Sequence, residues 1–252
     1  MNKSYDHIII DGHGTLYDDK YTPCAGALKF MRKYYKKTIL FSNIGSKTGY
    51  ELEQTLKVKF SILPYKIITS LDLMLNHIEK NKYRSIFHFG NNKLNHEINR
   101  YVPKIIENYE KRIKPDAVLF TSLPQDSVIL RMQAALNYIL SCNAKILLAN
   151  PDRITLNPPY KITVAILCDS IINSLSKIKR NIEIVEFGKP YIGKDDLNIK
   201  SYSDVVVIGD NPWTDVALAK KMGCDSILIT AKDVSKSVPY PVYKIKSLVE
   251  LC

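Results

Sequence analysis

The sequence predicts an α/β protein in which helices cover parallel sheets. Short apolar runs rich in β-branched residues alternate with stretches of helical periodicity along the whole 252-residue chain. No internal repeat or low-complexity tract interrupts this alternation. The composition, 46% hydrophobic and 24% charged, is ordinary for a folded globular protein. At this length the chain can form one large domain or two smaller ones with an ample core.

The first expected strand, Ile8–Ile10, ends at an acidic residue. Three β-branched residues in a row favour a fully buried strand. Asp11 follows directly, and Gly12 and Gly14 allow a tight turn and a close approach of the backbone to a ligand. Open α/β sheets bind ligands at the carboxyl ends of their strands. An ordinary Asp-Gly turn is the alternative, and for this stretch alone it is the stronger one.

Capping residues and periodicity place the remaining elements. Thr22 and Pro23 are expected to begin the first helix. Its inner face is expected to contain Ala27, Leu28, Met31 and Tyr35. Thr48 and Glu51 have the spacing of a capping box. Further strands are expected at Thr38–Phe41, Ser85–Phe89, Ala117–Thr121, Lys145–Ala149, Ile182–Val185, Asp204–Ile208, Ser226–Thr230 and Val242–Ile245. Further helices are expected from Ser70 and over Lys93–Arg100, Asp126–Ser141, Thr163–Leu175 and Thr214–Met222, the last with Gly223 as its C-cap.

Positive charge gathers in the middle of the chain. The net charge is +11 at pH 7, and residues 66–180 contain 17 Lys and Arg against 9 Asp and Glu, a net of +8. Such a segment could attract nucleic acid, an acidic membrane surface or small anions, although a solvated basic face is the commonest explanation. No basic run is interleaved with stacking aromatic residues, so nucleic acid is not the expected partner.

The cysteines and the apolar runs indicate in which cellular compartment the protein is expected. Five cysteines without a CxxC pair argue against a disulfide framework and a structural zinc site, so a reducing, cytoplasmic location is expected. The first apolar run is too short for a signal peptide. Asp72, His77 and Asp169 interrupt the longest apolar stretches, so no transmembrane helix and no membrane partner are expected.

Four expected strands end in polar residues: Asp11, Ser42, Lys189 and Asp210. If these strands share one parallel sheet, their ends meet at one edge. Paired carboxylates suit Mg²⁺, which prefers oxygen ligands, while a hydroxyl and an ammonium can hold phosphate oxygens. Asp11 could then attack phosphorus and form an aspartyl-phosphate. The constellation therefore favours phosphate chemistry.

Taken singly, each of these residues can be explained by a structural role without any chemistry. Ser42 and Asn43 are common turn residues, and Lys189 could be a surface lysine. Asp210 and Asp215 could cap the helix that follows them. Their order along the chain, each after an expected strand, makes phosphate chemistry the stronger hypothesis.

The same motifs resemble those of the haloacid dehalogenase-like (HAD) hydrolases. They are Asp11-Gly12-His13-Gly14-Thr15, Ser42-Asn43, Gly188-Lys189-Pro190 and the segment from Gly209 to Asp215. The resemblance covers nearly the whole chain. It implies a Rossmann-like parallel-sheet core, residues 1–79 and 180–252, with an inserted α/β cap at residues 80–179. The insert resembles the cap of the nitrophenylphosphatase and phosphoglycolate phosphatase branch.

The resemblance also implies roles for single residues. Asp11 would be the nucleophile, Ser42, Asn43 and Lys189 would hold phosphate, and Asp11, Asp210 and Asp215 would form the Mg²⁺ site. Asn150 and Asp152, in an Asn-Pro-Asp segment of the insert, would be candidate substrate residues of the cap. By spacing alone, a turn is the more frequent outcome for an Asn-Pro pair.

Two features depart from the family pattern. Working members usually carry a second aspartate two residues after the nucleophile, where this chain has His13. A histidine ordinarily titrates near pH ~6.5 and could replace the aspartate as the catalytic acid and base, or it could be a packing residue in a slow enzyme. The second departure is the length after Pro190, because only thirteen residues separate it from Asp204.

Two functional hypotheses follow. The first is a Mg²⁺-dependent phosphatase that hydrolyses small phosphorylated substrates through an aspartyl-phosphate, with reduced activity if His13 is a poor acid. The second is a catalytically impaired binding or regulatory protein on the same fold. The retained Asp11, Lys189 and Asp210 favour the enzyme, and His13 favours its rival. The substrate is not encoded in these motifs, and a homodimer remains open.

Overall fold

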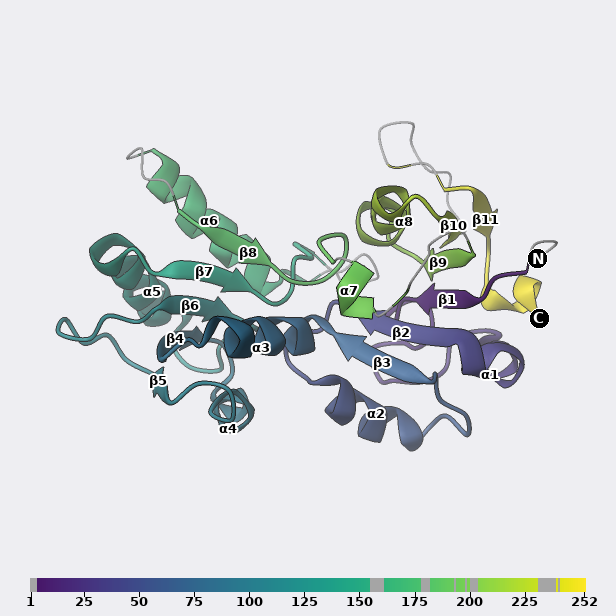
Figure 1. Ribbon diagram of the computed structural model, residues 1–252, viewed down its shortest axis with the longest axis horizontal. Helices are drawn as coiled ribbons and strands as arrows, with labels where there is room; N and C mark the ends of the chain where they lie inside the picture. The colour runs from purple at the N-terminus through teal and green to yellow at the C-terminus, as the bar shows by residue number, and fades with distance from the viewer. Residues whose placement is uncertain are drawn as a thin grey trace. The chain divides into compact units, whose positions relative to one another are not determined.

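The protein contains two parallel β-sheets with helices between the strands, which confirms the predicted fold class (Figure 1). The computed structural model describes residues 4–154, 161–177, 182–192, 194–197, 199, 204–230, 239 and 241–252. Among these residues, the first sheet has six strands in the order β11-β10-β9-β1-β2-β3, and the second has five in the order β5-β4-β6-β7-β8. Every pairing between the named strands is parallel.

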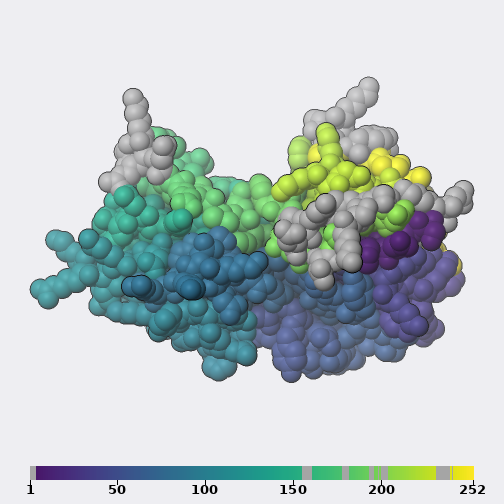
Figure 2. Space-filling view, in the orientation of Figure 1, coloured from purple at the N-terminus to yellow at the C-terminus, as the bar shows by residue number. Residues whose placement is uncertain are grey.

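The contacts divide the chain into two units, whose residues can be followed by colour in Figure 2. The first comprises Met1–Ser42, Thr48–Thr69 and Lys189–Cys252, and the second comprises Asn43–Lys47 and Ser70–Gly188. Helix α3 therefore groups with the second unit, whereas the expected ranges ended the core at residue 79. Residues 182–188, expected in the core, also group with the second unit, while residues 179 and 180 lie outside the described residues.

The first unit is organised around β1. Its sheet contains β1 (His7–Ile10), β2 (Thr38–Ser42), β3 (Lys66–Thr69), β9 (Val205–Gly209), β10 (Asp225–Ile229) and β11 (Tyr243–Ile245). Its helices are α1 (Ala27–Tyr34), α2 (Gly49–Lys57), α7 (Lys194–Leu197) and α8 (Ala217–Met222). Ile9 pairs with Ile39 on one side and Val207 on the other, and all three are fully buried. A strand covered on both faces needs a continuous apolar run, as Ile8–Ile10 supplies.

The second unit contains the other sheet. Its strands are β4 (Ser85–Phe89), β5 (Lys104–Ile106), β6 (Ala117–Phe120), β7 (Lys145–Leu148) and β8 (Ile184–Glu186). Its helices are α3 (Ser70–Asn81), α4 (Asn95–Ile98), α5 (Val128–Cys142) and α6 (Val164–Ser176). Aromatic side chains such as Phe87, Phe120 and Tyr138 pack with aliphatic residues of α5 and α6 in one core. No helix among the described residues combines the length and apolar character needed to cross a membrane.

Capping signals placed several helices correctly. Thr48 and Glu51 form the predicted capping box at α2, with both side-chain-to-backbone hydrogen bonds present. Gly223 ends α8 in the left-handed conformation, as predicted, at φ 70°. The helix expected from Thr214 begins instead as a π-helical turn, Pro212–Val216, before α8.

The predicted start of the first helix was wrong. Pro23 forms an isolated bridge with Tyr17, and the Cys24 amide donates to the Leu16 carbonyl, so this segment runs beside the loop after β1. The helix begins at Ala27, and its buried face contains Ala27, Phe30 and Met31. Leu28, expected on that face, is 38% exposed, because it lies about 100° around the helix from Ala27 and the buried face runs through Phe30 instead.

Two strands and one helix were not predicted. β3 has only four residues and runs directly into α3, whose start at Ser70 was expected. β5 and α7 contain three and four residues, too few to establish a periodicity.

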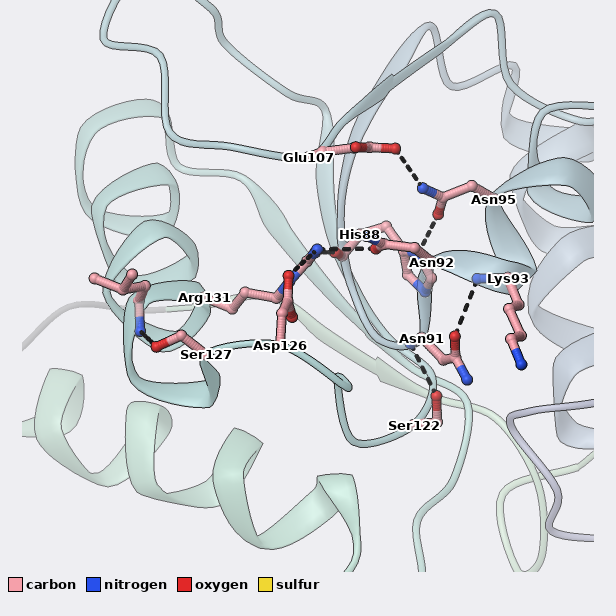
Figure 3. Close-up of polar contacts among 11 residues, drawn as sticks. His88, Asn91, Asn92, Lys93, Asn95, Glu107, Ser122, Asp126, Ser127 and Arg131 are labelled. Carbon is pink, nitrogen blue, oxygen red and sulfur yellow. Dashed lines mark hydrogen bonds and ion pairs between the residues drawn. The ribbon is translucent and has the colours of Figure 1, made fainter.

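A buried polar network ties β4 to α5 in the second unit (Figure 3). The His88 ring is hydrogen-bonded to Asn95 at 2.6 Å and to Thr121 at 2.8 Å. Arg131 donates to the His88 carbonyl at 3.0 Å and to Asp126 at 2.7 Å. Burial, with a further contribution from the Arg131 charge, lowers the pKa of His88 to about 4.

This network predicts a pH-dependent loss of stability. The unfolded state protonates His88 at its ordinary pKa of ~6.5, whereas the folded state resists protonation down to about 4. The contribution is therefore constant above pH ~6.5 and is lost as the pH falls from ~6.5 to about 4. The free energy of unfolding should therefore fall by roughly 3 kcal/mol over this pH interval.

The measurement is the free energy of unfolding between pH 4 and 7 for the wild type, His88→Gln and the control His96→Gln, whose parent side chain is exposed. His88→Gln should flatten the pH dependence, and His96→Gln should leave it as in the wild type. Equal slopes for all three proteins would contradict the prediction.

Candidate active site

Three carboxylates meet at the carboxyl ends of β1 and β9. Asp11 follows β1 and Asp210 follows β9, and these strands pair in parallel with Ile10 beside Ile208. Asp215 lies in the π-helical turn after Asp210. One carboxylate oxygen from each aspartate lies within 4.8 Å of the others. The structure thus brings together the three residues that the sequence proposed as a metal site.

Lys189 lies among these carboxylates. Its side chain is 1% exposed, and its Nζ donates to the Asp215 carboxylate at 2.7 Å and to the Asp11 carboxylate. The Phe41 ring lies below it, with the centroid 5.8 Å from Nζ. Burial alone would lower the Lys189 pKa, but Asp11 and Asp215 outweigh it and raise the pKa above its ordinary value. The ammonium is therefore charged.

Asp215 is the most deeply buried carboxylate of the cluster. Asn211 donates its backbone amide to Oδ2 at 3.0 Å, while Lys189 occupies Oδ1. A Cβ on Gly209 would lie 2.0 Å from Oδ2, so this approach requires glycine at position 209. Burial raises the Asp215 pKa and the charges of Asp11 and Asp210 raise it further, although Lys189 opposes them. Three carboxylates thus share one ammonium in this cluster.

The expectation that four strands of one sheet supply the site was wrong. β8, the strand before Lys189, pairs with β7 in the second sheet. The chain passes from the second unit to the first between Gly188 and Lys189. Lys189 thus reaches the carboxylates from a connecting segment, because its long side chain can enter the buried site without a strand of its own in that sheet. The segment from Pro190 to Asp204 contains only the one-turn helix α7 among its described residues.

Ser42 and Asn43, the expected phosphate residues, lie at the end of β2. Ser42 is the last residue of β2 and is 2% exposed. Asn43 belongs to the second unit, where its Nδ2 donates to Asp152 at 3.1 Å and its Oδ1 accepts from Ser70 at 3.4 Å. Two residues expected in different roles, Asn43 and Asp152, therefore contact each other.

The segment that begins at Asn150 forms a turn, as its Asn-Pro pair indicates. Asn150 Oδ1 accepts from the Asp152 amide at 3.0 Å, which is an Asx turn. The Arg153 guanidinium, next in the chain, donates to Asp169 and Glu186 at 3.0 Å each. These bonds hold the turn beside α6 and β8 of the same unit.

His13 lies in the loop that follows β1. Gly14 allows the turn with a left-handed φ of 82°. The His13 Nε2 lies 2.6 Å from the Asp19 carboxylate, and both side chains are partly exposed. Thr15, almost fully buried, places its hydroxyl 3.5 Å from the Asp210 carboxylate.

Sequence reasoning missed three contacts of the site: Phe41 below Lys189, Thr15 beside Asp210 and Asp19 beside His13. Thr15 stands within the glycine-containing motif, and that position was its available signal. Phe41 was expected only as an apolar residue at the end of a strand, and Asp19 stands in no recognisable spacing.

Comparison with known proteins gives matches to two family models. A model described as haloacid dehalogenase-like hydrolase matches residues 8–101, and one described as HAD-hydrolase-like matches residues 187–250. A comparison with curated proteins finds no match to this chain.

Solved structures share the fold over the whole chain. The p-nitrophenyl phosphatase from Archaeoglobus fulgidus is 19% identical, with 99% of this chain and 98% of that one covered and a TM-score of 0.79. NagD from E. coli K-12 is 22% identical, with 98% of both chains covered and a TM-score of 0.78. The glycerol phosphate phosphatase Rv1692 from Mycobacterium tuberculosis, solved with magnesium, is 18% identical, with 98% and 77% covered and a TM-score of 0.76.

The family models include the residues that form the site. The first spans Asp11 and Ser42, and the second spans Lys189, Asp210 and Asp215. The two matches lie in the order of the chain and together cover most of the first unit, where the carboxylates meet the buried ammonium. The chain therefore belongs to the haloacid dehalogenase-like hydrolases.

Proposed function

We propose that this protein is a Mg²⁺-dependent phosphatase that hydrolyses small phosphate esters through an aspartyl-phosphate on Asp11. The observation that carries the proposal is the contact of the Asp11 carboxylate with buried Lys189, beside Asp210 and Asp215. Structures of the same fold are described as phosphatases of p-nitrophenyl phosphate and glycerol phosphate, which supports a small phosphate ester as the substrate.

The donor set fits a hard divalent cation. Oxygens of Asp11, Asp210 and Asp215 converge, and these three carboxylates share the ammonium of Lys189. These three aspartates would hold the metal. Mg²⁺ bound there would offset negative charge on a phosphoryl group. The structure of Rv1692 with magnesium supports a divalent metal in this fold, although Rv1692 was also solved with calcium.

Asp11 supplies the nucleophile in this proposal. One carboxylate oxygen bonds to phosphorus, the ester P–O bond breaks, and the departing oxygen takes a proton. Water then attacks the phosphorus of the aspartyl-phosphate, which releases phosphate and restores the carboxylate. Lys189 and Ser42 hold the phosphoryl oxygens, with Asn43 as a further donor from the next residue.

His13 is the proposed source of the proton for the leaving group. Its pairing with Asp19 holds the ring through Nε2, so that Nδ1 is the nitrogen left to exchange a proton with substrate or water. His13 and Asp19 would together replace the second aspartate that the resemblance leads one to expect.

The second unit, Asn43–Lys47 and Ser70–Gly188, is the proposed cap. It replaces the expected range of residues 80–179. Asn150 and Asp152 remain the proposed substrate residues of this cap, with their turn fixed by the Asx hydrogen bond and by Arg153.

Replacement of the nucleophile tests the chemistry. Asp11→Asn should lower phosphate release by roughly 10³-fold or more, because the amide keeps the size but is a poor nucleophile. The measurement is phosphate release from a panel of phosphorylated metabolites with Mg²⁺, with exposed Asp6→Asn as the control. Wild-type turnover by a folded Asp11→Asn protein would contradict the proposed mechanism.

A pH–rate profile tests His13. If His13 supplies the proton, His13→Asp should move the pH dependence of the rate on an unactivated ester to lower pH, because a carboxylic acid ordinarily loses its proton at lower pH than an imidazole. Loss of the group should matter less for an activated ester, which needs less protonation. Asp19→Asn is the matched variant, since it removes the charge that holds the ring.

Rates on the activated and the unactivated ester distinguish the possible roles of His13. Identical profiles for the wild type and His13→Asp on both esters would remove His13 from the mechanism. No turnover by either protein on any ester would favour the binding or regulatory protein.

A further inference from the structure

A hollow of about 550 Å³ lies in the second unit at the amino-terminal edge of its sheet. Its lining residues come from the turn between α3 and β4, from the segment before β6, and from the end of α5 through the start of β7. Four of them are cations: Lys82, Arg84, Lys114 and Lys145. This hollow contains part of the positive charge that the sequence concentrates in residues 66–180.

Two carboxylates, Asp116 and Glu183, lie at the hollow or pair with its lining, against four cations. Asp116 is the one carboxylate that lines it, and its Oδ2 accepts the backbone amides of Arg84 and Ser85 at 2.7 and 3.0 Å. Glu183 pairs with Lys145 at 2.7 Å. In the part of the chain that the structure describes, Lys82, Arg84 and Lys114 form no ion pair. The hollow therefore has an unneutralised positive charge.

The backbone at Lys82 has an uncommon conformation. Lys82 follows the last residue of α3 with a left-handed φ of 54°. Helices usually end there with glycine or asparagine, because a β-carbon is unfavourable in this conformation. The chain instead has an exposed lysine, which lines the hollow.

We propose that this basic hollow binds a small anion with several phosphate groups. Charge-assisted hydrogen bonds from two lysines and an arginine suit phosphate oxygens, and the volume suits a small molecule. The proposed interaction is binding alone, with no chemical step. All lining residues belong to the second unit, and none is a residue of the proposed active site.

The form of the hollow argues against a nucleic acid strand. Single-stranded nucleic acids are bound by stacking their bases on aromatic side chains along a groove. The aromatic residue here, Tyr83, is 8% exposed and packs against His77, so its ring faces are not available for stacking. A compact ligand with high charge therefore fits the lining better than a long polyanion.

Calorimetric titration with inorganic tripolyphosphate, without divalent metal, tests the proposal. The pocket variant is Lys82→Gln, Arg84→Gln and Lys114→Gln. The control removes the same charge from exposed residues elsewhere: Lys93→Gln, Lys104→Gln and Arg32→Gln. The wild type and control should bind at the hollow with equal affinity, and the pocket variant should bind at least about tenfold more weakly. Tripolyphosphate that binds at the proposed active site should bind equally to all three proteins. Only the difference between the pocket variant and the control therefore reports on the hollow.

Cys142 locates the bound anion, because it lines the hollow and is partly exposed. Tripolyphosphate at ten times its dissociation constant should slow alkylation of Cys142 about tenfold in the wild type and control. It should have no such effect on Cys142 in the pocket variant or on Cys24 in the first unit.

Several results would overturn the proposal: absence of tripolyphosphate binding to the wild type, equal binding by the pocket variant and control, or unchanged alkylation of Cys142. A second contrary result would come from sedimentation with phosphatidylserine vesicles. If the wild type and control sediment with the vesicles and the pocket variant does not, the cations bind a membrane surface and the proposal is wrong. All three replaced side chains are exposed, so the pocket variant should unfold at the wild-type temperature. The single reversal Lys114→Glu provides a second test with less change to the surface.

Discussion

The buried ammonium of Lys189, held by Asp11 and Asp215, is the interaction on which the site depends. A charge taken out of water costs several kcal/mol unless it is paired and hydrogen-bonded. Here the pairing has a structural origin: β1 and β9 bring Asp11 and Asp210 to neighbouring strand ends, and the π-helical turn places Asp215 beside them. Gly209 leaves room for the Asp215 carboxylate. Three carboxylates that share one ammonium then make a divalent cation the natural partner.

The sequence predicted the carboxylates of this site better than it predicted Lys189. Asp11 and Asp210 follow buried strands directly, so the rule that parallel strands end at one edge was enough to bring them together. That rule misassigned Lys189, because β8 belongs to the other sheet and strand order cannot be derived from local patterns. The contact between Asn43 and Asp152 was equally hidden, since it joins residues far apart in the chain.

The fold was predictable where local signals and tertiary packing agree. Buried central strands such as Ile8–Ile10 need apolar residues on both faces, and the capping box of Thr48 fixes its helix end by its own hydrogen bonds. The start of α1 could not be derived in this way. Thr22 and Pro23 have the residue types of a helix start, but pairing with the loop after β1 keeps the segment extended. Tertiary contacts there override the local preference.

The response of the protein to Mg²⁺ tests most directly whether the three carboxylates form a cation site. The midpoint of thermal unfolding and the calorimetric affinity for Mg²⁺ should be measured for the wild type, Asp210→Asn and the exposed control Asp6→Asn. The account predicts that Mg²⁺ raises the midpoint of the wild type and of Asp6→Asn, because it binds only the folded site. Asp210→Asn should bind Mg²⁺ at least about tenfold more weakly, since a hard dication loses an anionic ligand. An equal response of all three proteins, or none in the wild type, would contradict the account.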